Sequence, residues 1–451
     1  MSSVKEPTLL LSHLPPFLTN AFADLAQWLH QKSAARLPLI LTGILFAHGR
    51  RTVSSWFRAA DITDDFRPAY TTVWAVGRNS DSLAVSTLHD LLPLLGKRRL
   101  RLAIDDTPTA RYGPHVEGAG IHHNPTPGPA GDKFLYGHVW VTLAVLASHP
   151  HWGTIALPLQ AQLYIRQCDL DKLPPERPRA FRTKLEMAAE QLHWLTLWTA
   201  EDFEETWVVV DGAYAKRPFL RAARLLDITV ISRLRKDAAL WSLPKRLAPE
   251  ERGPGRPPIY GTERFSLAKR AGHSCGWEQL ECVQYGQKVT KTIKTFLATW
   301  KPAGGVIRVV IVKEADGWLA YFSVGAAVTA VEILEAMADR NAEEQTFKDI
   351  KEVEGAGQQQ VRNVESNIGC FNLNLWMYSL VEAWAWNKGA VDLVDRSASP
   401  WDDQPRRPSH ADKRKSLQHE VLEGEIREAL SGRPSKAKIR ALADRLLDLA
   451  A

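Results

Sequence analysis

The chain has 451 residues, 45% of them hydrophobic and 24% charged, with a net charge of +6 and a pI near 9.0. This composition is typical of a globular protein with two or three structural units, and it excludes a disordered or fibrous chain. Apolar runs fall well short of the ~20 residues that span a bilayer, and no signal pattern is found, so we expect a cytoplasmic protein without a membrane partner. The basic excess favours a polyanionic partner.

Residues 1–95 are predicted to form a helical N-terminal domain. Apolar positions recur at helical spacing in residues 17–29, 37–46 and 83–95. Between them, the run RRTVSSWFR at residues 50–58 places basic and hydroxyl residues around a predicted helix start. Two interpretations remain open for this region: a helix-turn-helix that binds DNA, or a helical cap with a solvated basic face.

The pattern changes to strands in residues 96–232. The predicted elements are strands at 100–105, 136–147 and 153–165, a helix at 179–198, a strand at 207–211, a helix at 217–226 and a strand at 228–232. This is the element order of an RNase H-like sheet, in which the first and fourth strands are neighbours. Asp105 ends the first strand and Asp211 ends the fourth, so we expect the two carboxylates to lie side by side.

Residues 233–325 are predicted to form a mostly β insertion that begins with a basic, proline-rich segment containing Arg256. The core resumes at 326–390 with helices at 330–353 and 372–386. A polar linker at 392–416 and a helix at 420–449 complete the C-terminal region, 391–451. The predicted fold class is α/β: an RNase H-like mixed sheet with flanking helices, interrupted by a β insertion, with an N-terminal helical domain and a C-terminal helical tail.

A third acid, Glu344, lies in the helix expected at 330–353. Arg340, Lys348 and Lys351 are spaced so that they share one helical face with it. Such a face is usually solvated. If it faces the sheet instead, the carboxylate can bind metal and the cations can bind phosphates. Three carboxylates from separate elements suit a pair of Mg²⁺ or Mn²⁺ ions, which cleave phosphodiester bonds.

These motifs resemble those of the DDE transposases of bacterial insertion sequences. Asp105-Asp106-Thr107 fits the Asp-x-Thr pattern after the first strand, and Asp211-Gly-Ala-Tyr214 fits the aspartate and aromatic after the fourth. The family signature of Tyr, Arg, Glu and Lys is met by Arg340, Glu344 and Lys351, with Met337 at the tyrosine position. The resemblance covers residues 99–386, most of the chain.

The resemblance implies that Asp105, Asp211 and Glu344 are catalytic and bind two Mg²⁺ (or Mn²⁺) ions. It implies a nucleoid-associated enzyme that cuts double-stranded DNA at the ends of its mobile element, joins the 3′-hydroxyls to target DNA and works as a homodimer. The residues expected to contact DNA are Arg340, Lys348, Lys351, Tyr214 and Arg256.

Several alternatives stay open at this point. Asp106 is the fallback for Asp105, since neighbouring strand residues face opposite ways, whereas Glu343 is expected to be an exposed charge. The protein could instead be a catalytically silent, transposase-derived DNA-binding regulator. It could also be an RNase H-like nuclease that never joins strands.

Other side chains have a functional and a structural interpretation. The histidines either bind zinc or act as bases, or they have a loop or core role. The tryptophans either stack on bases or pack in the core. The cysteine pair either binds a metal or consists of reduced thiols. The lysines either contact phosphates or lie on an exposed strand edge. The residues concerned are His122, His123 and His138; Trp277 and Trp300; Cys275 and Cys282; Lys288, Lys291 and Lys294.

Overall fold

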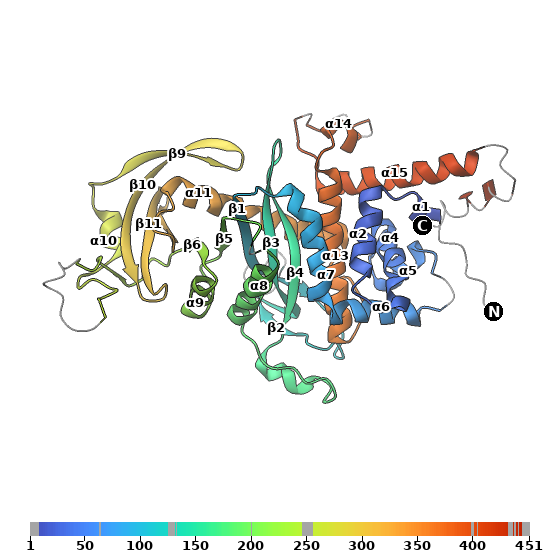
Figure 1. Ribbon diagram of the computed structural model, residues 1–451, viewed down its shortest axis with the longest axis horizontal. Coiled ribbons are helices and arrows are strands. Elements are labelled where there is room, and N and C mark those ends of the chain that lie inside the picture. The colour runs from blue at the N-terminus through green and yellow to red at the C-terminus, as the bar shows by residue number, and fades with distance from the viewer. Residues whose placement is uncertain are drawn as a thin grey trace.

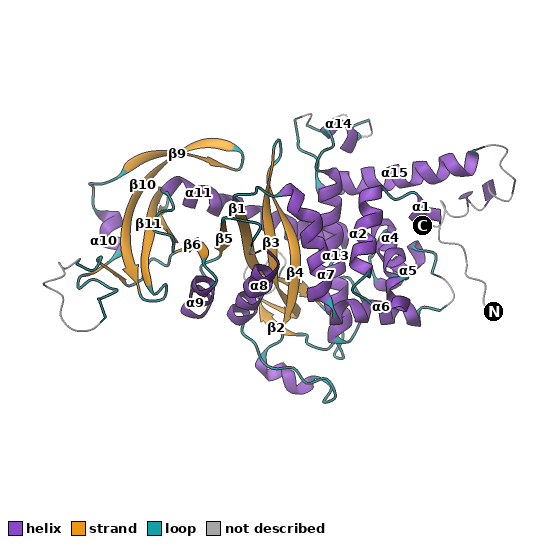
Figure 2. Ribbon diagram, viewed as in Figure 1, coloured by secondary structure: helices purple, strands orange, loops and turns teal. Residues whose placement is uncertain are grey.

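The computed structural model describes residues 9–62, 65–124, 131, 133–199, 201–245, 256–397, 401–403, 405–431, 436, 439–440 and 442–443. In this part of the chain, one mixed sheet of twelve strands connects the two ends of the molecule. The helices of residues 9–91 gather at one end and the strands that follow residue 233 at the other (Figures 1 and 2). No helix in the described ranges has both the length and the apolar character needed to cross a bilayer.

Five strands of the sheet have the arrangement expected from the sequence. The parallel neighbours β1, β5 and β6 lie beside the antiparallel β3 and β4, in the order β4-β3-β1-β5-β6, which is consistent with an RNase H-like fold. A short strand, β2, lies in the expected loop and pairs with the start of β3. The bounds are β1 (Arg99–Ala110), β2 (Gly120–His123), β3 (Phe134–His149), β4 (Gly153–Tyr164), β5 (Glu205–Val210) and β6 (Ile228–Arg233).

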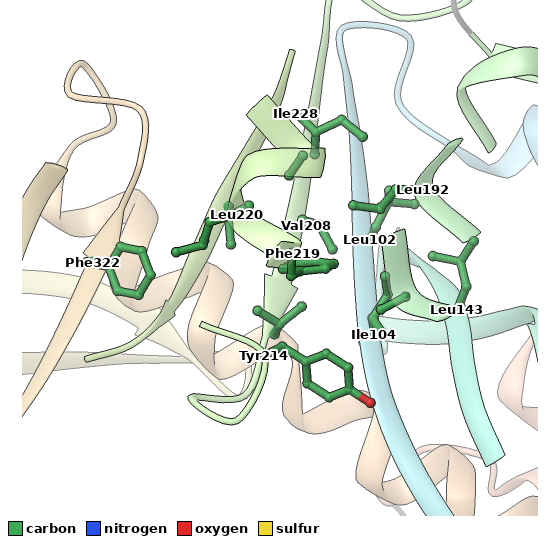
Figure 3. Packing of buried hydrophobic residues seen from close by; sticks show 14 of the residues in the cluster. Leu102, Ile104, Leu143, Leu192, Val208, Tyr214, Phe219, Leu220, Ile228 and Phe322 are labelled. Atoms are coloured by element: carbon green, nitrogen blue, oxygen red, sulfur yellow. The ribbon is translucent and has the colours of Figure 1, made fainter. Parts of the chain in front are cut away.

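The central strand β5 is apolar because both of its faces are covered. Val208 and Val210 face α8 (Lys184–Thr199) and α9 (Arg217–Leu225), while Trp207 and Val209 belong to a second core on the opposite face, against α11 (Ala330–Asp339). Figure 3 shows the first of these cores, with the side chains of β1, β5 and α9 in contact around Phe219. The buried sheet is therefore a rigid support for the residues at its strand ends.

The insertion continues the same sheet. β12 pairs antiparallel with β6, with Ser323 opposite Ile231, and the remaining strands follow outward from β12. The bounds are β7 (Leu240–Trp241), β8 (Arg264–Phe265), α10 (Leu267–Gly272), β9 (Glu278–Gln284), β10 (Gln287–Trp300), β11 (Gly305–Glu314) and β12 (Gly317–Ser323). Trp300 is buried against Phe322, which confirms its core interpretation. Lys294 is also buried and donates to the backbone oxygen of Arg270 at 2.8 Å, so it does not lie on an exposed strand edge.

The helical end of the molecule has one core built from distant parts of the chain. α13 (Val364–Ala385) lies between β4 and the N-terminal helices, and α15 (His410–Leu430) packs across it (Figure 1). Buried side chains of these two helices and of the N-terminal helices form one apolar cluster. The N-terminal helices are α1 (Leu9–Ser12), α2 (Pro16–Ala26), α3 (Gln31–Ala34), α4 (Leu37–Phe46), α5 (Val53–Ala59), α6 (Arg67–Arg78) and α7 (Ser80–Leu91).

Three helix boundaries differ from the expected ones. α13 begins at Val364 because the Asn363 side chain caps it, accepting from the Ser366 N–H at 2.7 Å. α15 begins at His410, inside the expected linker, because Ser409 and Asp412 form a capping box. The helix expected at 330–353 is divided at Arg340 into α11 and α12 (Asn341–Asp349), and a π-helical turn, η4 (Ile350–Glu354), follows. Beyond residue 431, most of the expected C-terminal helix lies outside the described residues.

Candidate active site

The first two acids lie side by side at the point where two parallel strands separate. β1 does not end at Asp105, as expected, but continues to Ala110 along β3. β5 does end, at Val210, which is paired with Ile104. Asp105 and Asp211 are therefore the next residues on two adjacent strands. Asp211 interacts electrostatically with Asp105 and raises its pKa.

Asp105 is a mostly buried acid with an unusual titration. Burial raises its pKa to about 6, Arg340 opposes that rise, and Asp106 and Asp211 add to it. One carboxylate oxygen accepts from the Asp106 N–H at 2.8 Å, and the other is paired with the Arg340 guanidinium. A single cation therefore compensates a site in which two aspartates lie close together.

Asp106 has different partners on the opposite face of β1. Lys184 donates to one of its oxygens at 2.6 Å and the Tyr214 hydroxyl to the other at 3.2 Å. The strand alternation expected from the sequence is confirmed. Tyr214 is only 2% exposed, with its hydroxyl directed at β1 (Figure 3), so the expectation that it contacts DNA is wrong for this conformation. Its ring is needed in the core beneath α9.

Arg340 lies at the junction of α11 and α12, among the acids. Burial lowers its pKa, but Asp105, Glu343, Asp211 and Glu344 together raise it above the ordinary value. Besides its pair with Asp105, it lies 3.7 Å from a Glu344 oxygen. Arg340 is expected from the sequence to contact DNA, and in this structure its side chain is 12% exposed and pairs with Asp105 as a counterion of the acid group.

The two neighbouring glutamates of α12 have exchanged the environments expected for them. Glu343 is only 1% exposed, whereas the Glu344 side chain is 61% exposed, so the expectation that Glu343 is a surface charge is wrong. The reason is the rotation of α12. Thr346 and Phe347 are its buried residues, Thr346 donates to the Ala156 oxygen of β4 at 3.0 Å, and Glu343 lies on that inward face.

Glu343 lacks full compensation. One of its oxygens is 3.3 Å from the Thr142 hydroxyl, and the other has no hydrogen-bond partner among the described residues. Burial, followed by the nearby charge of Asp105, raises its pKa well above the usual range. Sequence reasoning missed this residue, although its four-residue spacing from the buried Phe347 could have indicated an inward position.

The remaining cations expected to bind DNA lie outside the acid group. Lys348 and Arg256 are exposed. Lys351 is partly buried, and burial alone lowers its pKa to about 8. No ion pair is found for it within the described ranges, so its charge is available to a ligand.

The donors of this acid group are chemically suited to a divalent cation, although their present arrangement does not form a site for one. The donors are carboxylate oxygens, which suit Mg²⁺ or Mn²⁺, and the unpartnered oxygen of buried Glu343 together with the raised pKa of Asp105 indicates a deficit of positive charge. Within the described residues, however, no three His, Cys, Asp or Glu side chains are placed to hold an ion as they stand. Arg340 provides the compensating charge instead.

Two of the histidines considered as alternatives are core residues. His138 is fully buried, with Nε2 at 3.0 Å from the Glu117 backbone oxygen, and burial lowers its pKa to about 3. Burial also lowers the pKa of His122 to about 4. Both side chains are buried, which supports the core interpretation for them.

A sheet of this order, with two aspartates where neighbouring parallel strands separate, is consistent with the RNase H-like class of nucleic-acid enzymes. Residues 24–296 match the family described as DDE superfamily endonuclease. Since the match covers more than half of the chain, the protein belongs to that family and is a DDE-type endonuclease that acts on DNA. The matched range contains Asp105 and Asp211 and ends before α12. Comparison with the curated proteins finds no match.

Proposed function

We propose that the protein is a metal-dependent DDE transposase that cleaves DNA at the ends of its own mobile element and joins the 3′-hydroxyl ends to target DNA. One observation carries the proposal: Asp105 and Asp211 follow paired residues of β1 and β5, at the place where the two strands separate and α12 lies against the sheet. The DDE endonuclease family supports the same chemistry.

We assign the metal-binding role to Asp105, Asp211 and Glu344. Glu344 is chosen over Glu343 because of its spacing from Arg340 and Lys351, and its carboxylate lies 3.7 Å from the guanidinium that also contacts Asp105. Two Mg²⁺ or Mn²⁺ ions, when bound, supply charge for the attacking and leaving oxygens of an in-line displacement.

The other side chains position the acids and the DNA. With divalent cations bound at the acids, Asp105 would no longer need Arg340 as its counterion, and the guanidinium would be free to bind a phosphate. Lys348 and Lys351, further along the same helix, bind the flanking phosphates. Arg256 in the insertion adds a distant backbone contact. Glu343 is a buried carboxyl that supports the Asp105 segment through Thr142.

The reaction has two displacements at one centre. Water first attacks the phosphodiester bond at the element end, which releases a 3′-hydroxyl. This hydroxyl then attacks a phosphodiester bond of the target, so that one bond forms as another breaks. No covalent bond between protein and DNA is required. We propose that a homodimer, associated with the nucleoid, holds the two ends together.

The test uses purified full-length protein, Mg²⁺ and a plasmid that carries the gene with its flanking DNA. We expect nicks at the element ends and joined products with a second plasmid. Asp211→Ala should abolish both products but still bind DNA, while Asp171→Ala, at an exposed position, should behave like the wild type. Nicks without joined products would establish a nuclease without strand transfer. DNA binding without nicks would establish a silent regulator, and cleavage by Asp211→Ala would refute the assigned centre.

A further inference from the structure

A second feature of interest is a cavity of about 380 Å³ beyond the far end of β1. Its walls are the segment 111–116, which follows β1, and the segment 357–362, which follows η4 and precedes α13. Six residues separate Arg111 from Asp105, so at about 3.3 Å per strand residue the cavity lies roughly 20 Å from the acid group. At about 3.4 Å per nucleotide, that distance corresponds to roughly six nucleotides of DNA.

The two walls are held together by a buried arginine. The Arg111 guanidinium donates to the backbone oxygens of Gly357 at 3.3 Å and Val361 at 2.8 Å, and also to that of Gln359. The Glu117 N–H donates to the Arg362 oxygen at 2.9 Å. Gly357 has φ +96°, and a side chain there would approach Thr109 to 3.0 Å, so the close packing of this turn requires glycine. The cavity is therefore a built feature of the fold.

Two buried donors at this cavity lack partners. Gln359 is 1% exposed, and its side-chain oxygen accepts from the Gly357 N–H at 2.8 Å. Its amide nitrogen has no hydrogen-bond partner among the described residues, and neither has Nε of Arg111. A buried polar group without a partner destabilises the fold. Both side chains line the cavity, but the two nitrogens themselves are buried in this conformation.

An exposed aromatic ring and exposed basic side chains line the cavity. Tyr112 is 80% exposed and also lines a neighbouring hollow of about 440 Å³ that contains Phe134 and Tyr136. Arg50 and Arg362 are exposed and line the cavity. Among the described residues, no acidic side chain lines either hollow. A flat aromatic face with cations and no anions suits a nucleobase and its phosphates.

We propose that this cavity binds an unpaired nucleotide of the DNA substrate, about six nucleotides from the cleaved phosphate. The base stacks on the exposed ring of Tyr112, and Arg50 and Arg362 contact the adjoining phosphates. This inference rests on the proposed function for the identity of the substrate.

The experiment compares two DNA probes by fluorescence anisotropy with the full-length protein in Ca²⁺. One probe is a duplex with a central single-stranded gap, and the other is the same duplex fully paired. We expect Tyr112→Ala to weaken binding of the gapped probe about tenfold, because stacking of one base on an aromatic side chain contributes roughly 5- to 150-fold, and to leave the paired probe within about twofold. Tyr112→Phe, which keeps the ring, and Trp401→Ala, at another exposed aromatic, should match the wild type.

A second readout places 2-aminopurine in the gap. Its fluorescence should fall on binding the wild type and Tyr112→Phe but not Tyr112→Ala, since stacking on the ring quenches it. Equal losses for both probes, or no loss for either, would overturn the nucleotide site. Those results leave the proposed transposase intact as long as the wild type still cleaves and Asp211→Ala does not. Failure of the wild type to bind either probe would count against both proposals.

Discussion

Two groups of buried charges lie near opposite ends of the same helical segment, residues 340–354, and they differ in how well their charges are balanced. At the start of the segment, Asp105 and Glu343 share one nearby guanidinium, that of Arg340. At its end, Glu354 and Glu382 contact His410, with Lys413 and Arg414 alongside.

The pKa values of the acids follow this balance of charges. His410 lies 2.8 Å from an oxygen of each glutamate. Although burial opposes it, the charge of Lys413 and the hydrogen bond from His410 lower the pKa of Glu382 to about 2. Near Arg340, burial prevails and raises the pKa of Asp105 to about 6. Burial alone therefore does not identify a reactive acid. The deficit of counterions at Asp105 indicates a site for an external cation, whereas the group around His410 anchors α15 to α13 and η4.

The largest effect should come from replacing Asp105, which lies in the group that lacks counterions. Asp105→Asn should lower DNA cleavage about a thousandfold, because metal ligands stabilise the transition state by several kcal/mol and each 1.36 kcal/mol is a factor of ten. Asp106→Asn, next to it but facing Lys184, should stay within about tenfold. Cleavage rates with Mg²⁺ measure both. Equal losses would show that Asp105 and Asp106, on opposite faces of β1, do not have different roles in cleavage.

A substitution in the charge-balanced group around His410 should lower the free energy of unfolding. Glu382→Gln leaves buried Lys413 without its carboxylate, so we expect unfolding to become easier by about 3 kcal/mol. Urea unfolding followed by tryptophan fluorescence measures the loss. Glu420→Gln, which removes a surface pair with Lys388, is the matched control and should cost less than about 1 kcal/mol. A similar cost for both variants would mean that the buried network is not an anchor.

Lys351, between the two groups, should make DNA affinity depend on pH. Its pKa is lowered to about 8, so it is mostly charged at pH 7 and mostly neutral at pH 9. Phosphate binding favours the charged form, and affinity should therefore fall up to about tenfold as pH rises from 7 to 9. Lys351→Arg stays charged and should remove most of this fall. An unchanged pH profile in that variant would exclude a phosphate contact by Lys351.

The smallest effect is expected at Glu343. Burial raises the pKa of this carboxyl well above the usual range, and glutamine has the same shape without the proton equilibrium. Glu343→Gln should change unfolding stability by less than about 1 kcal/mol and cleavage by less than about threefold, in contrast to Glu382→Gln. A cleavage loss as large as that of Glu344→Gln would instead identify Glu343 as the ligand that α12 supplies to the metal. Metal binding by calorimetry distinguishes the same two outcomes without relying on activity.

The sequence alone predicted most of the elements and the neighbouring positions of Asp105 and Asp211. Strand patterns are local, so the alternating and apolar runs around Asp105 and Asp211 were enough to predict β1, β5 and their neighbours. The length of β1 was not predicted, because its last residues, 106–110, are held by β3 rather than by their own pattern.

Only the tertiary structure decided which side chains face the centre. The contacts of Thr346 with β4 set the rotation of the short helix α12, and that rotation buries Glu343 and exposes Glu344. In the same way, packing beneath α9 buries Tyr214, and the acids gathered from β1 and α12 draw Arg340 inward. Periodicity over one or two helical turns does not fix a rotation, since a change of one residue turns the helix by about 100°. Partners distant in sequence have to fix it.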